Sequence, residues 1–368
     1  MKIAFDSQIF TMQKYGGISR YVCSLATHLV KSEGIEAKIF APFYINVYLG
    51  KLAKRVVSGI KIPKIPKTGR FFHSCGLWLA RRSIAKFAPQ IVHETYYAKC
   101  HLPIKGARTV VTVYDMIHER FPSIFSEHDR TSQLKRESVL RADHVICISE
   151  NTRRDLLDFV PVSPDKVSVV HLGFDQVFVL DNMDSSISIT NKIPFLLFVG
   201  GRGHYKNFDG FLKAYGESEW LRENFRIVCI GGGKLRVDEL DLMNKFAIDS
   251  SQVEQFTADD TLLAEYYRSA AAFIYPSKYE GFGIPPLEAM SLKCPVICSN
   301  SSSIPEVVGD AGEYFDPNNT DSMRVAIERV LKSKEYRQIL VQKGIKRCAS
   351  FSWEKCASET LAIYRKII

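Results

Sequence analysis

Short apolar runs alternate with longer amphipathic stretches along the whole chain, in two successive series. Strands of a parallel sheet are buried on both faces and read as short apolar runs, whereas helices place apolar residues at intervals of three and four. The first series predicts strands at residues 2–6, 36–41, 90–94, 109–115, 144–149 and 166–171. The second series predicts strands at residues 195–201, 225–233, 252–257, 271–277 and 295–300.

Amphipathic helices are predicted between several of these strands. Residues 16–30 place five apolar side chains on one helical face: Ile18, Tyr21, Val22, Leu25 and Leu29. Residues 127–141 give a second example. Strands that alternate with helices in this way are typical of α/β domains with a doubly wound parallel sheet.

The stretch between the two series, residues 180–194, is polar, rich in Ser and Asn, and has no clear period. It predicts a linker between two domains, and a chain of 368 residues is long enough for two separate cores. In doubly wound domains ligands bind outside the carboxyl ends of the strands. We therefore expect the functional residues in the loops that follow the predicted strands.

Composition indicates a soluble globular protein, with 46% hydrophobic and 24% charged residues. The first residues lack the apolar run of a signal peptide, and no stretch approaches the ~18 apolar residues of a membrane span. The nine cysteines are scattered without a CxxC pair, which favours free thiols in a reducing compartment. These features predict a cytoplasmic protein.

The net charge of +9 is concentrated in residues 37–93. This stretch contains eleven Lys and Arg residues and no Asp or Glu, while the rest of the chain is close to neutral. A solvated basic face is one interpretation. The other is an anionic partner, either a membrane surface to which the protein attaches peripherally or a phosphorylated lipid, because large apolar residues are interleaved with the charges. No nucleic-acid recognition motif accompanies the charge, so nucleic acid is not an expected partner.

Three strand ends are followed by turns that suit a phosphorylated ligand. Gly16 and Gly17 follow the first strand and begin a helix, and Arg202 and Lys206 follow the strand at 195–201. The third turn, "EGFGIPPLE" (residues 280–288), has glycines and prolines between two glutamates and is expected to open a helix at Leu287. Backbone N–H groups at helix starts bind anions, and proline is tolerated in the first helical turn. Each feature alone also suits a plain turn or a solvated surface.

Other phosphate and metal motifs do not fit. The run "CIGGGKL" lacks the first glycine and the Ser or Thr of a Walker loop, and no GxGxxG opens a helix after the first strand. Neither an Asp-x-Asp triplet nor a His/Cys cluster with metal-ligand spacing occurs. We therefore expect no metal and no cofactor, with phosphate charge balanced by side chains and helix ends.

Taken together, these motifs resemble those of the retaining glycosyltransferases of family 4. "EGFGIPPLE" is similar to the E-x7-E motif of that family, and "GGISRY", "FVGGRGHYKN" and "SSIPEVVGDAG" match its surroundings. The resemblance implies the GT-B fold: two Rossmann-like domains that face a cleft, here residues 1–180 for the acceptor and 181–350 for the nucleotide-sugar. It also implies that residues 351–368 form a helix that crosses back to the first domain.

The resemblance further implies roles for individual residues. Glu280 falls on the glutamate that contacts hydroxyls of the donor sugar, and Glu288 on the one that binds the ribose. Arg202 and Lys206 fall on the pair that binds the diphosphate, and Gly16 and Gly17 on the loop that faces the phosphates. The donor-binding set is completed by the residues between the two glutamates: Gly281, Phe282, Gly283 and Ile284.

One position departs from the family. Where many members carry a histidine that contacts the donor sugar, this chain has Tyr114, followed by Asp115. A phenol still donates and accepts a hydrogen bond, so Tyr114 is retained with Glu280 and Asp115 as a catalytic candidate. His118 could replace the missing histidine or could be structural.

These observations predict a metal-independent, retaining hexosyltransferase of bacterial polysaccharide or lipopolysaccharide synthesis. "VHETYY" and "TVYDMIHERFP" resemble mannosyltransferase-like members, which suggests GDP-mannose as donor, with UDP- and dTDP-sugars left open. The expected acceptor is a saccharide or a polyprenyl-diphosphate-linked saccharide. Two alternatives remain open. A nucleotide-sugar 2-epimerase shares the architecture, and a non-catalytic subunit would bind a nucleotide-sugar without turnover.

Overall fold

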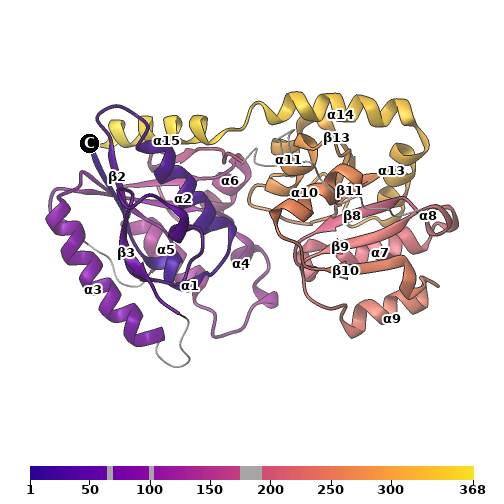
Figure 1. Cartoon of the computed structure of the whole chain (residues 1–368), viewed down its shortest axis with the longest axis horizontal. Helices are drawn as coiled ribbons and strands as arrows, with labels where there is room; N and C mark the ends of the chain where they lie inside the picture. The colour runs from indigo at the N-terminus through magenta and orange to yellow at the C-terminus, as the bar shows by residue number, and fades with distance from the viewer. Residues whose placement is uncertain (64–68, 99–102, 175–192) are drawn as a thin grey trace. The chain divides into compact units, whose positions relative to one another are not determined.

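The computed structural model describes residues 1–63, 69–98, 103–174 and 193–368, and of residues 69–74 the backbone alone. The chain divides into two compact units: Met1–Gly173 together with Ser352–Ile368, and Phe174–Phe351. The predicted linker at 180–194 and the predicted boundary at residue 180 fall largely in 175–192, outside the described residues. Each unit is an α/β layer structure (Figure 1).

The first unit is built on a seven-stranded parallel sheet in the order β3-β2-β1-β4-β5-β6-β7. Its strands are β1 (Lys2–Phe5), β2 (Glu36–Tyr44), β3 (Val57–Lys61), β4 (Ile91–Glu94), β5 (Arg108–Val113), β6 (His144–Cys147) and β7 (Val167–Val169). Its helices are α1 (Gln8–Met12), α2 (Gly17–Leu29), α3 (Gly69–Phe87), α4 (Ile117–Arg120), α5 (Thr131–Arg141), α6 (Glu150–Phe159) and α15 (Trp353–Ile367).

The second unit has a six-stranded parallel sheet in the order β10-β9-β8-β11-β12-β13. Its strands are β8 (Phe195–Val199), β9 (Arg226–Ile230), β10 (Val253–Phe256), β11 (Ala272–Tyr275), β12 (Val296–Ser299) and β13 (Gly312–Phe315). Its helices are α7 (Phe208–Gly216), α8 (Glu219–Asn224), α9 (Val237–Lys245), α10 (Asp260–Ser269), α11 (Ile284–Ser291), α12 (Ile304–Val308), α13 (Thr320–Lys332) and α14 (Lys334–Cys348).

Both sheets therefore confirm the predicted doubly wound architecture. Every strand expected from the sequence is present, and two further strands, β3 and β13, were not among those expected. Two helices begin elsewhere than predicted. Helix α5 begins at Thr131 instead of residue 127, and α11 begins at Ile284 instead of Leu287, with both prolines inside its first turn.

The last helix, α15, packs against α2 of the first unit, as the sequence predicted for the end of the chain. Its side chains Trp353, Cys356, Leu361 and Tyr364 are buried. The Tyr364 hydroxyl lies 2.5 Å from Nδ1 of His93 on β4. Burial lowers the pKa of His93 to about 3, so a neutral imidazole joins the terminal helix to the sheet.

Candidate functional site

The strand order of the second sheet reverses between β8 and β11, which lie side by side at its centre. From β8 the chain goes to β9 and β10 on one side, and then to β11, β12 and β13 on the other. The loops that leave the carboxyl ends of β8 and β11 therefore diverge at a topological switch point, where doubly wound sheets bind ligands. These two loops carry Lys206 and Glu280.

Backbone and side-chain hydrogen bonds join the two loops. The N–H of Lys278 donates to the carbonyl of Tyr205 at 2.7 Å. Asn207, buried and in the left-handed region at φ 56°, donates from Nδ2 to the carbonyls of Pro276 (3.1 Å) and Pro317 (2.8 Å). Asparagine tolerates this backbone conformation better than most residues. These hydrogen bonds fix the backbone of Asn207, and with it the position of the preceding residue, Lys206.

Lys206 and Glu280 form an ion pair, with 2.6 Å between Nζ and Oε1, although 74 residues separate them along the chain. Their side chains are 23% and 10% exposed, so the pair is accessible at one side of a mostly buried setting. Burial and the Glu280 carboxylate raise the pKa of Tyr275 well above its usual value, which keeps this phenol protonated beside the carboxylate. A cation and an acceptor of hydroxyl hydrogen bonds therefore lie together at the switch point.

Glu288 lies in α11, the helix that begins directly after the loop of Glu280. Its carboxylate is mostly buried and accepts a hydrogen bond from the Tyr267 hydroxyl at 3.4 Å. Gly283 precedes the helix at φ 113°, a conformation that a side chain would strain, and so allows the chain to turn sharply into α11. Residues 281–283 therefore lead from Glu280 to α11, in which Ile284 is the first residue and Glu288 the fifth.

The Arg202 side chain does not lie beside the Lys206–Glu280 ion pair. It is directed into the interior of the second unit. Its side chain is 1% exposed and pairs with Glu239 of α9, with 3.0 Å between Nε and Oε1. Its other nitrogens donate to three carbonyl oxygens, those of Gly231 (2.9 Å), Gly233 (2.8 Å) and Lys234 (2.7 Å). In this structure the guanidinium holds the loop after β9; a contact with a diphosphate stays a prediction.

The loop held by Arg202 contains three consecutive glycines with positive φ, Gly231, Gly232 and Gly233. A Cβ on Gly232 would lie 2.8 Å from Nη1 of Arg202 and 3.1 Å from the carbonyl oxygen of Gly200. Both the conformation and the close approach therefore require glycine. The run "GGGK", which fails as a Walker loop, has a structural explanation here.

The remaining predicted residues belong to the first unit. Gly16 caps the start of α2, where a Cβ would lie 2.2 Å from Oε1 of Gln13, and Gly17 is exposed at its first position. Tyr114 is buried, donates its hydroxyl to the carbonyl of Thr95 at 3.2 Å, and contacts the ring of Tyr21 edge-on. The phenol proposed for sugar contact is thus engaged inside its own unit.

Asp115 and His118 also have local partners. The Asp115 carboxylate accepts from the N–H of Ile117 at 3.1 Å, and the buried Lys135 ammonium lies 3.9 Å from it. His118 stacks on Phe125 with 3.8 Å between ring centroids, and its Nε2 lies 3.6 Å from Asp129. These contacts favour the structural interpretation of His118.

Sequence reasoning did not identify several polar residues at these sheet edges. Asp6, completely buried after β1, accepts from the N–H (3.1 Å) and hydroxyl (2.5 Å) of Thr95 and from Nε2 of Gln8 (2.6 Å). Ser302 and Ser303 contact the loop of Glu280. Asp6 follows a buried strand directly, and Ser302 and Ser303 begin the run "SSIPEVVGDAG" that matches the family, but neither observation assigned these side chains a role.

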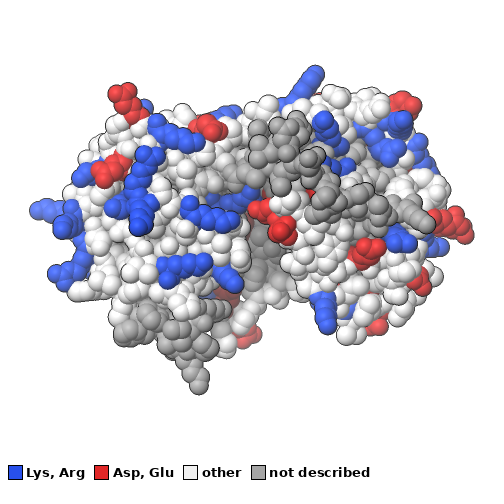
Figure 2. Space-filling model, in the orientation of Figure 1, with Lys and Arg blue, Asp and Glu red and all other residues white. Residues whose placement is uncertain are grey.

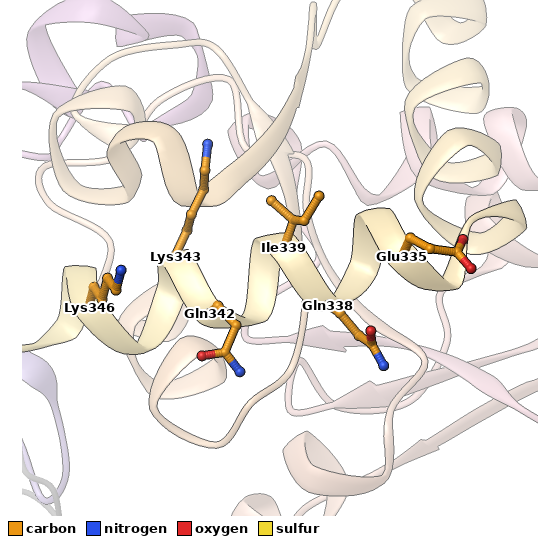
Figure 3. A pocket seen from close by; sticks show the side chains of 6 residues that line it. All are labelled: Glu335, Gln338, Ile339, Gln342, Lys343 and Lys346. Atoms are coloured by element: carbon orange, nitrogen blue, oxygen red, sulfur yellow. The ribbon is translucent and has the colours of Figure 1, made fainter.

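Two surface hollows of the described residues lie away from the Lys206–Glu280 pair. The hollow in Figure 3, about 420 Å³, is lined by side chains that all project from α14: Glu335, Gln338, Ile339, Gln342, Lys343 and Lys346. A second hollow of about 440 Å³ lies beside His118, Phe125 and Asp129 in the first unit. Neither includes a predicted donor-site residue.

Two further classes of feature were sought in the part of the chain that the structure describes. Within it, no group of three or more His, Cys, Asp or Glu side chains is arranged to hold a metal ion. Nor does any helix there have the length and apolar character needed to cross a membrane. The metal independence predicted from the sequence stays a prediction.

Comparison with known proteins places these features in a family. Residues 15–177 match the family model "Glycosyltransferase Family 4", and residues 181–347 match "Glycosyl transferases group 1". O-antigen chain mannosyltransferase B of Escherichia coli is 28% identical over 275 residues, which is 72% of either chain. O-antigen chain mannosyltransferase RfbU of Salmonella typhimurium is 26% identical over 327 residues, 85% of this chain and 87% of that protein.

Solved structures agree at the level of the fold. Sucrose-phosphate synthase of Thermosynechococcus elongatus superposes with a TM-score of 0.75 at 19% identity, covering 100% of this chain and 99% of that one. WaaG, a glycosyltransferase of lipopolysaccharide biosynthesis, superposes with a TM-score of 0.74 at 16% identity, covering 98% and 99%. With two family models that between them match most of the sequence, and with the GT-B fold, the chain belongs to glycosyltransferase family 4.

Proposed function

We propose that the protein transfers a mannosyl residue from GDP-mannose to a saccharide, or to a polyprenyl-diphosphate-linked saccharide, in the synthesis of a bacterial surface polysaccharide. The observation that carries the proposal is the pairing of Lys206 with Glu280 at the switch point of the second sheet, with Glu288 at the other end of the same turn. The names of the related O-antigen mannosyltransferases support the choice of sugar.

The three side chains suit different parts of a nucleotide-diphospho-sugar. Carboxylates accept hydrogen bonds from vicinal hydroxyls, so Glu280 suits the sugar and Glu288 suits the ribose. Lys206 supplies a positive charge beside Glu280, which suits the diphosphate next to the sugar. The start of α11 at Ile284 adds the favourable end of a helix dipole close to the same turn.

The chemistry we propose is transfer with retention of configuration. The bond between C1 of the sugar and the diphosphate oxygen breaks, and a bond from C1 to the acceptor oxygen forms on the same face. The acceptor hydroxyl gives its proton to an oxygen of the departing diphosphate, so no side chain has to act as the base. Lys206 stabilises the negative charge that develops on the diphosphate, a task that needs no metal ion.

Attachment to an anionic membrane would bring the enzyme to a lipid-linked acceptor. Helix α3 lies in the basic stretch 37–93, of which residues 64–68 are outside the described residues, and it buries Ala80 and Ile84 against the first sheet. Trp78 (57% exposed) and Leu79 (36%) face outward, and the Arg82 guanidinium lies 4.7 Å from the Trp78 ring. Figure 2 shows Lys and Arg side chains gathered over the first unit, at the left.

A direct test of the function is to incubate the full chain with a panel of GDP-, UDP- and dTDP-sugars. Nucleotide-sugar binding, measured by thermal shift, should be strongest for GDP-mannose. Transfer is then followed by mass spectrometry with mannose-containing oligosaccharide and polyprenyl-diphosphate-saccharide acceptors, with and without a chelator. Conversion of the donor sugar without any acceptor would indicate the epimerase, and binding without turnover would indicate the non-catalytic subunit.

The membrane proposal has its own test, co-sedimentation with vesicles of increasing anionic lipid content. Each basic residue near such a surface contributes about 1 kcal/mol, and this attraction is screened by salt. Replacing Arg81, Arg82 and Lys86 by Gln should therefore weaken binding at low salt, whereas replacing Lys213, Lys245 and Lys332 of the second unit should not. If both triple variants bind anionic vesicles equally well, the basic stretch is only a solvated face and not a membrane-binding surface.

A further inference from the structure

The turn after β12 contacts the loop of Glu280 at several points. Ser299 at the end of β12 and Ser303 before α12 are completely buried, whereas Ser302 between them is partly exposed. The Ser299 hydroxyl donates to the carbonyl of Ser277 at 2.5 Å. Small hydroxyl side chains at three nearby positions thus face the backbone of the loop that follows β11.

Ser302 and Ser303 form hydrogen bonds with the backbone of Glu280 itself. The N–H of Glu280 donates to Oγ of Ser302 at 2.8 Å. The single proton of the Ser303 hydroxyl is shared between the carbonyls of Glu280 (2.8 Å) and Phe282 (2.9 Å). The backbone N–H and the backbone carbonyl of Glu280 are therefore both bound by two consecutive serines from another part of the chain.

The backbone of Ser302 is in the left-handed region, at φ 52°. A residue other than Gly, Asn or Asp is uncommon there, and such strain persists only where surrounding contacts over-determine it. The strained conformation presents Oγ of Ser302 to the Glu280 amide. Strained residues of this kind cluster at sites where geometry is part of the function.

Ser303 also sets the orientation of two peptide planes. In a trans peptide the carbonyl and the following N–H point in opposite directions. Because the carbonyls of Glu280 and Phe282 both point to Ser303, the N–H groups of the two following glycines are directed away from it. The hydroxyl therefore fixes how the turn between the two glutamates presents its backbone, including Gly283 at the start of α11.

We infer that Ser302 and Ser303 are positioning residues for sugar transfer: they hold Glu280 and the turn after it in the geometry that the donor sugar requires. This inference rests on the proposed function, because Glu280 is assigned to the sugar there. Neither serine need touch the donor. Their effect is transmitted through the backbone of Glu280, Gly281 and Phe282.

The test uses Ser302→Ala, Ser303→Ala and the double variant in the full chain. We expect kcat for transfer to fall between about ten- and a hundredfold, the order of loss caused by ~1 Å of misplacement, while the affinity for the bare nucleoside diphosphate stays within about twofold. Ser302→Asn restores an acceptor and tolerates the left-handed backbone, so it should recover part of the activity. Hydrogen exchange of residues 276–283 should accelerate in the alanine variants.

A double-mutant cycle separates positioning from general stability. If the serines act through the Glu280 side chain, Ser303→Ala should cause little further loss of kcat in a Glu280→Gln background. Ser333→Ala is the matched control, because its hydroxyl accepts from the Tyr336 N–H at 3.1 Å at the start of α14. It should lower thermal stability and leave kcat unchanged.

Additive losses in the cycle, or equal losses of kcat and nucleotide affinity, would overturn the inference while leaving the transferase proposal intact. Conversely, a wild-type protein that binds no nucleotide-sugar would refute the proposed function. In that case faster exchange at residues 276–283 in Ser303→Ala would still establish that the serines order this loop, but not that they serve sugar transfer.

Discussion

The two sheets have the same winding, yet the polar residues at their switch points behave in opposite ways. In the first unit, β1 and β4 end in Asp6 and Thr95, which bind one another, and burial raises the pKa of Asp6 despite those hydrogen bonds. In the second unit, β8 and β11 lead to Lys206 and Glu280, which pair at a partly exposed position. One switch point is closed by its own side chains and the other is accessible to a charged ligand.

This difference teaches that topology supplies a location for a ligand but not the chemistry. Loops diverge at both switch points and an ion pair lies at each, but the Glu94 side chain of the first pair is 2% exposed, whereas the Glu280 side chain of the second is 10% exposed. The inward-facing network of the first unit stiffens its sheet edge, so a ligand of that unit would have to be recognised by other residues. The predictions below test how far the contrast holds.

The largest effect is expected for Arg202, the one predicted ligand of the second unit whose guanidinium is directed inward. Arg202→Met should destabilise the second unit by about 3–5 kcal/mol, because it leaves the buried Glu239 carboxylate without this partner. Chemical denaturation followed by circular dichroism measures the loss. Arg226→Met, which removes a partly exposed pair with Glu254, is the control and should cost about 1 kcal/mol or less.

Arg202 would instead behave like Lys206 if it binds the diphosphate directly. Arg202→Met would then unfold like the wild type and lose only donor affinity. That result would place Arg202 with Lys206 and Glu280 among the residues that contact the ligand.

Glu280→Gln tests the partly exposed switch point of the second unit. Transfer should fall about 10²–10³-fold, equivalent to about 2.7–4 kcal/mol, since a preorganised group aimed at the reacting sugar is lost. Nucleoside diphosphate affinity, measured by calorimetry, should be nearly unchanged. Glu313→Gln is the matched buried carboxylate, bound to Arg329 and Tyr336, and should affect stability but not transfer. A parallel loss of nucleotide affinity in Glu280→Gln would contradict the division of roles between the two glutamates.

Glu288→Ala separates the two ends of the donor. We expect binding of the bare nucleoside diphosphate and of the nucleotide-sugar to weaken alike, by about 1.5–3 kcal/mol, because a charged acceptor of ribose hydroxyls is removed. Calorimetric titration of the folded variant with both ligands gives the two values. An affinity for nucleoside diphosphate equal to that of the wild type would exclude Glu288 from the site.

The smallest effect is expected for Tyr114→Phe in the first unit. Loss of the hydrogen bond to the Thr95 carbonyl should cost about 0.5–1.5 kcal/mol of stability, with transfer little altered. Thermal unfolding and initial rates on the same preparation measure both. A large fall in kcat with unchanged stability would assign Tyr114 to catalysis, and the first switch point would then be functional as well.

The sequence predicted the architecture because buried parallel strands leave a clear apolar signal. The strands it missed have weak signals: β3 contains Gly59 and exposed Ile60, and β13 begins with Gly312 and has the polar Glu313 at its second position. In helix α3 the charged residues Arg81, Arg82 and Lys86 interrupt the apolar pattern to which the buried Ala80 and Ile84 belong.

For the site, residue types were predictable and their orientations were not. The spacing of Glu280 and Glu288 is visible in the sequence, but the direction of Arg202 depends on Glu239, 37 residues away, which no local pattern reveals. The grip of Ser302 and Ser303 on the Glu280 backbone likewise arises only when two neighbouring strands bring their loops together. Such long-range contacts are properties of the fold.

The return of the terminal helix has a consequence for how the chain is made. Gly173 and Trp353 lie so close that a Cβ on the glycine would be 2.3 Å from the Trp353 nitrogen, so the chain leaves and re-enters the first unit at one point. Topologically the second unit is an insertion into the first. During synthesis on the ribosome it has all of its residues before α15 has emerged, while the first unit still lacks the partner of α2. Although translation of the first unit begins earlier, we therefore expect the second unit to complete its folding first.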